Sequence, residues 1–184
     1  AKGVNVTSEV TVHHLTLTDE ACATYNPATR VSPPLRSWDH VQAMREAVLD
    51  GTVDAIVTDH APHAPEEKDV EFRYAPCGFC GLETSLGVML TDLYHTNIFD
   101  LKTIISKMSC EPSKLFKLER GTLAEGAVAD ITIMDLNIEW TVDSSKFYTR
   151  GKFTPYEGKE CKGKAVATML AGKFVMRDGV VCAK

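Results

Sequence analysis

Val53-Asp54-Ala55-Ile56-Val57-Thr58-Asp59-His60-Ala61-Pro62-His63 is the stretch that decides how this chain of 184 residues folds. It begins with a short run of mostly β-branched and apolar residues, which is typical of a strand buried in a parallel sheet. An aspartate and two histidines follow the run. Because catalytic groups gather at the carboxyl ends of parallel strands, Asp59 and His63 are candidates for chemistry. On spacing alone, an aspartate that caps the next turn beside surface histidines explains the pattern equally well.

The composition is that of an ordinary globular domain, because 44% of the residues are hydrophobic and 24% are charged. The formal net charge of −5 argues against a nucleic-acid-binding protein. No apolar run approaches the length of a membrane span. We therefore expect neither a nucleic acid nor a membrane as a partner.

The six cysteines are scattered, and only Cys77 and Cys80 lie close together, in Cys-Gly-Phe-Cys. Scattered cysteines favour reduced thiols and a cytoplasmic location. A zinc or redox site at Cys77 and Cys80 is the alternative, but a lone Cys-x-x-C lacks the second pair of a structural zinc site.

The predicted elements change in character near residue 120. Before it, residues 1–3 suggest the end of a helix, and residues 61–81 suggest a long polar loop. Strands are predicted over residues 4–7, 9–13 and 53–58. Helices are predicted over residues 38–50, 82–95, 101–108 and 112–118. After it, strands are predicted over residues 129–134, 165–170 and 173–177. The sequence therefore predicts a domain boundary between residues 1–120 and 121–184.

The motif around Asp59 resembles the signature of bacterial-type dihydroorotases in the amidohydrolase superfamily. Further motifs follow the order of that family along nearly the whole chain. They are Glu9-Val10-Thr11-Val12-His13-His14, Pro33-Pro34-Leu35-Arg36, Glu66-Glu67-Lys68, the stretch from Ala75 to Thr84, the stretch from Gly121 to Asp130, and Thr154-Pro155-Tyr156-Glu157-Gly158. The resemblance implies an α/β fold. Residues 1–120 would be the C-terminal portion of a metal-dependent hydrolase (β/α)8 TIM barrel, and residues 121–184 would be part of a small composite β-sandwich domain.

Dihydroorotases interconvert L-dihydroorotate and N-carbamoyl-L-aspartate in pyrimidine biosynthesis, and the resemblance implies zinc as the cofactor. Zinc activates water and polarises the carbonyl of the ring amide. Asp59 matches the family aspartate that is both a zinc ligand and the general acid/base. The other metal ligands of the family lie in upstream segments that this sequence does not contain, so the chain alone should be inactive.

Further residues match positions of the family that lie near the substrate. His63 matches the residue that contacts the substrate carboxylate, and the alternative is a hydrogen bond within its loop. Ser32 stands where the family often has an asparagine that contacts the substrate ring. Gly78 and Gly81 would let the backbone approach that ring closely. Arg36 matches an arginine beside the site, although a surface arginine at a helix start explains it equally well.

His13 and His14 form a pair that could suggest metal ligands at the end of a strand. The resemblance instead places them in the wall of the site, because the metal-binding histidines of the family lie upstream. The mixed charges of Glu66-Glu67-Lys68 indicate a solvated loop, which in this family resembles a lid.

Two alternatives to a dihydroorotase stay open. One is another cyclic amidohydrolase, such as an allantoinase or a hydantoinase, which shares the fold. The other is a non-catalytic dihydroorotase-like subunit that scaffolds a partner such as aspartate transcarbamoylase. The presence of Asp59 and His63 argues against the second. The family also commonly forms homodimers.

Overall fold

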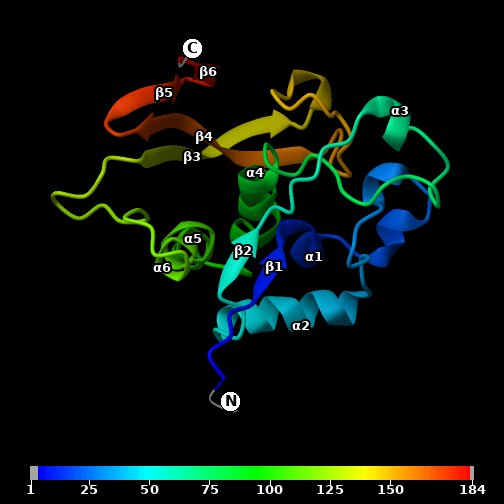
Figure 1. Cartoon of the computed structure of the whole chain (residues 1–184), viewed down its shortest axis with the longest axis horizontal. Coiled ribbons are helices and arrows are strands. Elements are labelled where there is room, and N and C mark those ends of the chain that lie inside the picture. Colours follow the sequence, from blue (N-terminus) through cyan, green and yellow to red (C-terminus); the bar gives the residue numbers. More distant parts are fainter. Residues whose placement is uncertain (1–3, 183–184) are drawn as a thin grey trace.

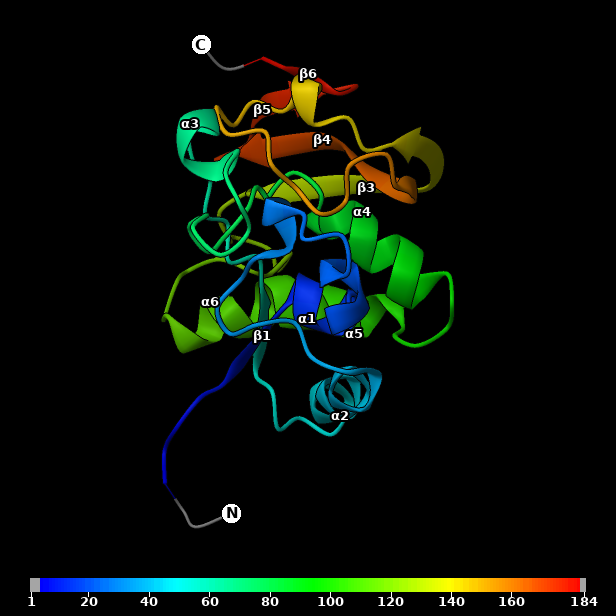
Figure 2. The same cartoon turned by 90° about the vertical axis from the view of Figure 1, so that its right-hand side faces the viewer.

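The computed structural model describes residues 4–182, and the helix end predicted at residues 1–3 lies outside them. A four-stranded antiparallel sheet lies at the top of Figure 1, and a pair of parallel strands lies below it among the helices. Turned by 90°, that sheet and α2 (Trp38–Leu49) lie on opposite sides of a middle layer that contains α1 (Val12–Thr16) and α4 (Ser85–Met89) (Figure 2). None of the helices in the described part of the chain is both long and apolar enough to cross a membrane.

The parallel pair consists of β1 (Glu9–Thr11) and β2 (Ala55–Val57), with Val10 opposite Ile56. Parallel strands need a long crossover, and here it runs through α1, two short 3₁₀ turns (Asp19–Cys22 and Pro27–Thr29) and α2. The buried strand predicted in the signature stretch is therefore confirmed. Each of the two strands has a single neighbour within residues 4–182, as in a piece of a larger parallel sheet.

Of the two strand predictions near the start of the chain, the first is wrong and the second is right except for its end. Residues 4–7 form no strand, and β1 ends at Thr11. The reason lies in the side chain of Thr11, whose Oγ1 accepts the backbone N–H of His14 at 3.2 Å and so caps α1. His13 and His14 therefore lie on a helical turn after the strand rather than in it.

The helix predicted over residues 38–50 is confirmed as α2, with Ser37 at its N-cap position. It buries Val41, Arg45 and Val48. The guanidinium of Arg45 reaches across to α1, where its Nε donates to the carbonyl of Leu15 at 2.9 Å. This contact gives the buried guanidinium a hydrogen-bond acceptor and joins α2 to α1.

The later helices contain π-helical turns, and the helix predicted over residues 82–95 is shorter than expected. The helix α4 continues as a π-helical turn over Leu90–Tyr94. The two helices predicted over residues 101–108 and 112–118 form one stretch, made of α5 (Leu101–Ile105), a π-helical turn (Ser106–Cys110) and α6 (Glu111–Leu115). Pro112 explains the π-helical turn, because its ring has no N–H to donate and displaces the carbonyl one turn earlier.

The antiparallel sheet has the strand order β3 (Ile131–Thr141), β4 (Glu160–Leu170), β5 (Lys173–Arg177) and β6 (Val180–Val181). Its first two strands are longer than the predicted strands over residues 129–134 and 165–170. The β3–β4 register shifts between Asp135 and Glu139, where the two strands part. Within residues 4–182 this region is a single sheet, so the second layer of the expected sandwich is not among the described residues.

One hydrophobic core runs through both parts of the chain. Buried residues of the barrel portion, such as Val10 and Ile56, belong to the same cluster as Val142 and Tyr156. The link across residue 120 is an exposed connection with no helix or strand from residue 118 to residue 130. The boundary near residue 120 remains a prediction.

Candidate active site

A cavity of about 570 Å³ opens beside the ends of β1 and β2. Three of the predicted site residues line it, namely Asp59, Ser32 and Arg36. His14 lines it as well, whereas His63, Gly78 and Gly81 do not. The fold thus brings together residues from distant parts of the sequence, from His14 to Asp59, at the carboxyl end of a parallel strand pair.

Asp59 comes two residues after the end of β2 and is exposed. Its backbone has a φ of +49°, in the left-handed region that non-glycine residues seldom adopt. Aspartate tolerates that region better than most residues. Such a conformation is common at functional sites, where the surrounding structure holds it in place.

His60 ties the signature stretch to the loop that follows it. It forms a parallel bridge with Phe79, and its Nδ1 accepts the N–H of Leu82 at 3.1 Å. The N–H of Ala61 donates to the carbonyl of Phe79 at 3.0 Å. These contacts give His60 a structural role at the end of β2.

His63 contacts the same loop at a second point. Its Nε2 donates to the carbonyl of Cys77 at 2.9 Å, and its Nδ1 lies 3.7 Å from a carboxylate oxygen of Glu67. The hydrogen bond within the loop, which was the alternative for His63, is therefore present. About a quarter of the side chain is exposed, 24%, so the imidazole remains accessible from solvent.

Gly78 and Gly81 lie where the loop meets the signature stretch. A Cβ at Gly78 would lie 2.6 Å from the Cβ of Ala61 and 3.4 Å from Nε2 of His63, and its φ is +117°. A Cβ at Gly81 would lie 3.1 Å from the carbonyl oxygen of Thr58. Glycine is required at Gly78 by space and by backbone conformation, which is consistent with close backbone approach at this place.

His14 holds the wall of the cavity. Its Nε2 donates to the carbonyl of Pro33 at 3.1 Å, and its Nδ1 lies 2.7 Å from Oγ1 of Thr11. Since a carbonyl can only accept, Nε2 carries the proton and Nδ1 accepts from the threonine hydroxyl. His14 thereby fixes the loop that carries Ser32.

His13 points into the core instead. It is 1% exposed, its ring lies 5.0 Å from that of Phe79, and neither ring nitrogen has a hydrogen-bond partner among the described residues. Burial, with a smaller effect from nearby His14, lowers the pKa of His13 to about 3. His13 is therefore neutral at physiological pH.

Arg36 is exposed at the start of α2. Its Nη2 lies 3.3 Å from Nε2 of His40, and both residues line the cavity. The structure thus puts the guanidinium at the mouth of the same cavity as Asp59. This position suits either alternative for Arg36, a partner for a carboxylate or a surface residue at a helix start.

A segment from the later part of the chain supports the loop from outside. The carboxylate of Glu83 accepts the N–H of Tyr148 at 2.9 Å and that of Thr149 at 3.0 Å. The N–H of Cys80 donates to the carbonyl of Phe153 at 2.8 Å. The sequence motifs of the two parts are therefore in direct contact, which sequence spacing alone does not reveal.

Lys68 is not the solvated loop residue that the mixed charges of Glu66-Glu67-Lys68 predicted, and that expectation is wrong for this residue. The segment forms a short helix, α3 (Pro65–Lys68), and Lys68 is fully buried at its end, 0% exposed. Its Nζ donates to the carbonyl of Pro76 at 2.7 Å. Nothing in the local charge pattern distinguishes this lysine from a solvated one.

The described residues do not make a complete metal site. Within residues 4–182, no three side chains of His, Cys, Asp or Glu lie close enough together to hold a metal ion. Cys77 is exposed and Cys80 is buried, and all six cysteines are free thiols. A metal held by Asp59 would therefore need donors from outside this set.

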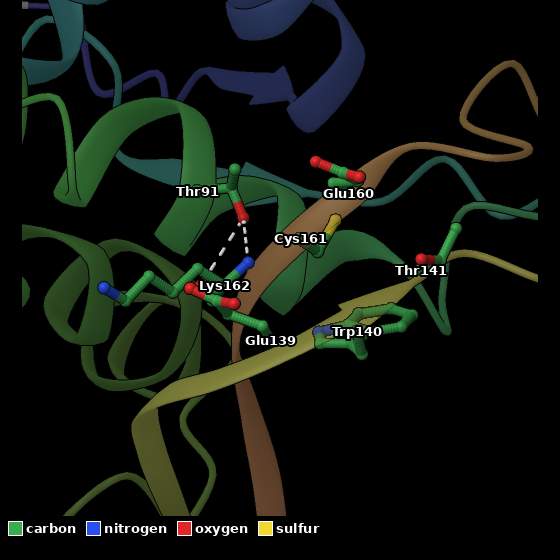
Figure 3. A pocket seen from close by; sticks show the side chains of 7 residues that line it. All are labelled: Thr91, Glu139, Trp140, Thr141, Glu160, Cys161 and Lys162. Atoms are coloured by element: carbon green, nitrogen blue, oxygen red, sulfur yellow. Dashed lines mark hydrogen bonds between the residues drawn. The ribbon is translucent and has the colours of Figure 1, made fainter.

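A second cavity, of about 430 Å³, lies between the π-helical turn after α4 and the paired ends of β3 and β4, where Glu139 is opposite Lys162 (Figure 3). Its lining includes Glu139, Glu160 and Lys162, and no predicted site residue. The N–H of Lys162 donates to Oγ1 of Thr91 at 2.8 Å, so this region joins the sheet to the helix.

A family model described as "Amidohydrolase family" matches residues 2–175. The chain belongs to the amidohydrolase family. The position of Asp59, which follows a parallel strand and lines a cavity, agrees with that membership. The resemblance inferred from the sequence is confirmed.

Curated relatives of this amidohydrolase include dihydroorotases. The one from Pelotomaculum thermopropionicum is 46% identical over 181 residues, which cover 98% of this chain and 42% of that protein. The one from Syntrophus aciditrophicus is 48% identical over 177 residues, which cover 96% of this chain and 41% of that protein. The chain thus spans about two fifths of the length of these relatives.

Solved amidohydrolase structures confirm the predicted fold class. An L-hydantoinase (dihydropyrimidinase) from Arthrobacter aurescens superposes with a TM-score of 0.92 at 33% identity, over 98% of this chain and 41% of that one. A dihydropyrimidinase from Brevibacillus agri superposes with a TM-score of 0.90 at 24% identity, over 98% of this chain and 41% of that one, and shows the fold alone.

Proposed function

We propose that this chain is the C-terminal portion of a zinc-dependent dihydroorotase, which interconverts L-dihydroorotate and N-carbamoyl-L-aspartate in pyrimidine biosynthesis. The observation that carries the proposal is Asp59, which follows a parallel strand and lines a cavity with Ser32 and Arg36. The identity of 46% to a dihydroorotase over nearly the whole chain supports it.

Zinc, when bound, would activate water and polarise the carbonyl of the ring amide. Asp59 would hold the ion and accept a proton from the water whose oxygen adds to the carbonyl carbon. It would then pass that proton to the amide nitrogen as the ring C–N bond breaks. The exposed carboxylate, fixed by an unusual backbone conformation, suits a group that must both bind and exchange a proton.

The substrate would be held mainly by the cavity wall and the loop beside it. We assign His63 to the substrate carboxylate and Arg36 to charge at the cavity mouth. Ser32 would contact the ring through its hydroxyl, and the backbone at Gly78 and Gly81 would lie against the ring. His63 would have to exchange or share its contact with the carbonyl of Cys77, which is 2.9 Å away.

The remaining zinc ligands would come from segments outside this sequence, so we expect the chain alone to be inactive. We propose a domain boundary near residue 120 and a cytoplasmic location, with which the six free thiols are consistent. A homodimer, or an association with aspartate transcarbamoylase, is the arrangement that the family resemblance suggests for the larger protein.

A hydantoinase activity is the second candidate, because the fold superposes on an L-hydantoinase with a TM-score of 0.92. The fold is common to the whole family, however, and identity to that protein is 33% against 46% to a dihydroorotase. Fold alone does not decide between substrates.

A chimera tests the proposal. In it, this chain replaces the matching region of the Pelotomaculum thermopropionicum dihydroorotase, and turnover of dihydroorotate, hydantoin and allantoin is measured. We expect turnover of dihydroorotate alone. Turnover of hydantoin in preference to dihydroorotate by a folded chimera would support the second candidate and contradict the first.

A further inference from the structure

Lys68 is a buried cation whose Nζ contacts a backbone carbonyl and, within residues 4–182, forms no ion pair with a carboxylate. It is 0% exposed, and its Nζ donates to the carbonyl of Pro76 at 2.7 Å. Burial lowers its pKa to about 8, against the opposing effect of Cys77 and Cys80 and with a further decrease from Arg30. Burying an ammonium group is costly, so a lysine that only filled space would be a poor choice here.

The carbonyl that Lys68 holds lies next to the one that His63 holds. His63 donates to the carbonyl of Cys77 at 2.9 Å, one residue after Pro76. His63 and Lys68, which lie five residues apart, therefore donate hydrogen bonds to the carbonyls of two successive residues. The hydrogen bond from Lys68 is charge-assisted, and such bonds are shorter and stronger than those between neutral groups.

Gly78 is fixed from the opposite direction. Its N–H donates to the carbonyl of Arg30 at 2.9 Å, and its α-carbon packs so closely on Ala61 that a Cβ would lie 2.6 Å from that residue's Cβ. The orientation of each peptide group in Pro76–Gly78 thus depends on a contact from outside these three residues. Removing the ammonium group of Lys68 would leave the carbonyl of Pro76 without this hydrogen bond.

We propose that Lys68 is a positioning residue that holds Pro76–Gly78 in the orientation in which His63 and the Gly78 backbone face the substrate. The inference rests on the proposed function, because that function gives His63 and Gly78 their roles. Lys68 itself touches neither the substrate nor the reacting atoms.

The test uses K68M, which keeps the length of the side chain and removes its donors, and K68Q, which keeps a donor. The matched control is K107M, since Lys107 also donates from Nζ to a backbone carbonyl, that of Val53, in a partly buried place away from the loop. Amide hydrogen exchange is followed at Gly78 and, as a reference for the whole fold, at Ile56 in β2, in the 184-residue chain without substrate.

We expect K68M to speed exchange at Gly78 by about tenfold relative to Ile56, as loss of a charged hydrogen bond predicts, with partial recovery in K68Q and no such ratio change in K107M. In the chimera, K68M should raise KM for dihydroorotate by about tenfold and change kcat by less than about threefold, because Lys68 acts on binding geometry.

Unchanged exchange at Gly78 in K68M, or equal acceleration at Gly78 and Ile56, would overturn the proposal. A chimera that is inactive with lysine at position 68 would count against the dihydroorotase function alone. The exchange ratio would still decide whether Lys68 positions the loop.

Discussion

At the scale of single residues, the sequence predicts some positions in the candidate site and not others. The place of Asp59 directly after a buried strand could be predicted, because a run of β-branched residues leads into it. The burial of Lys68 could not be predicted, because it depends on a loop that returns eight residues later to offer the carbonyl of Pro76. His13 was likewise ambiguous, since only the tertiary fold places its ring against Phe79.

His13 should make the chain sensitive to acid. Its pKa falls from 6.5 to about 3 on folding, so the unfolded chain binds the proton first as the pH falls. Stability is then complete above about pH 6.5 and is lost between about pH 6.5 and 3, at up to about 1.4 kcal/mol per pH unit. Urea unfolding at several pH values, compared with H13Q, measures this, and parallel pH dependences in the two proteins would contradict it.

Ser32 should bind the substrate ring less tightly than an asparagine at this position would. It lines the cavity with Asp59 and stands where the resembling family often has asparagine. In the chimera, S32N should lower KM for dihydroorotate by about threefold to tenfold, as a regained hydrogen bond predicts. Steady-state kinetics measures this, with Ser37→Asn as a surface control, and an increased KM in S32N would place Ser32 outside the ring contact.

Helices and strands were predicted well where the hydrophobic pattern is strong. They were predicted poorly where a single side chain determines the end of an element. The apolar repeat of α2 and the β-branched run of β2 predicted both elements. The end of β1 was missed because one hydroxyl, that of Thr11, caps α1. The length of β3 was missed because its central part alternates weakly and is mostly exposed.

The packing of the sheet on α4 depends on glycine. A Cβ at Gly87 would lie 2.5 Å from Cζ2 of Trp140, whose indole N–H donates to the carbonyl of Gly163 at 3.0 Å. We expect G87A to destabilise the chain by about 1–3 kcal/mol, because overpacking outweighs the better helix propensity of alanine.

Chemical unfolding measures the effect of G87A, and the double variant G87A/W140L should lose part of the additional cost. A G87A chain that is as stable as the wild type would show that the indole can move aside without penalty.

At the scale of the molecule, the parallel pair β1–β2 offers unpaired edges, and the outer sheet exposes apolar side chains. In that sheet Leu170 is 53% exposed and Val180 is 64% exposed. Surfaces of this kind are normally covered by further structure. The family could be predicted from ordered motifs, whereas the contacts between the two parts of the chain could not, because they join residues about 65 positions apart, such as Glu83 and Tyr148.

The chain alone should hold no tightly bound zinc. Asp59 is the single ligand that we assign to it, and a tetrahedral zinc site needs three or four protein donors. Elemental analysis after removal of loosely bound metal should find far less than one zinc per chain. Close to one zinc per chain would mean that a donor set forms that we do not assign.

The most direct test of the account is the turnover of dihydroorotate by the chimera with Asp59 and by the same chimera carrying D59N, which tolerates the positive φ of this position. We predict clear turnover with aspartate and a loss of kcat of about 100-fold to 10,000-fold with asparagine, as removal of a general acid/base predicts. Near-normal turnover by the D59N chimera would contradict the central role of Asp59 and with it the proposed mechanism.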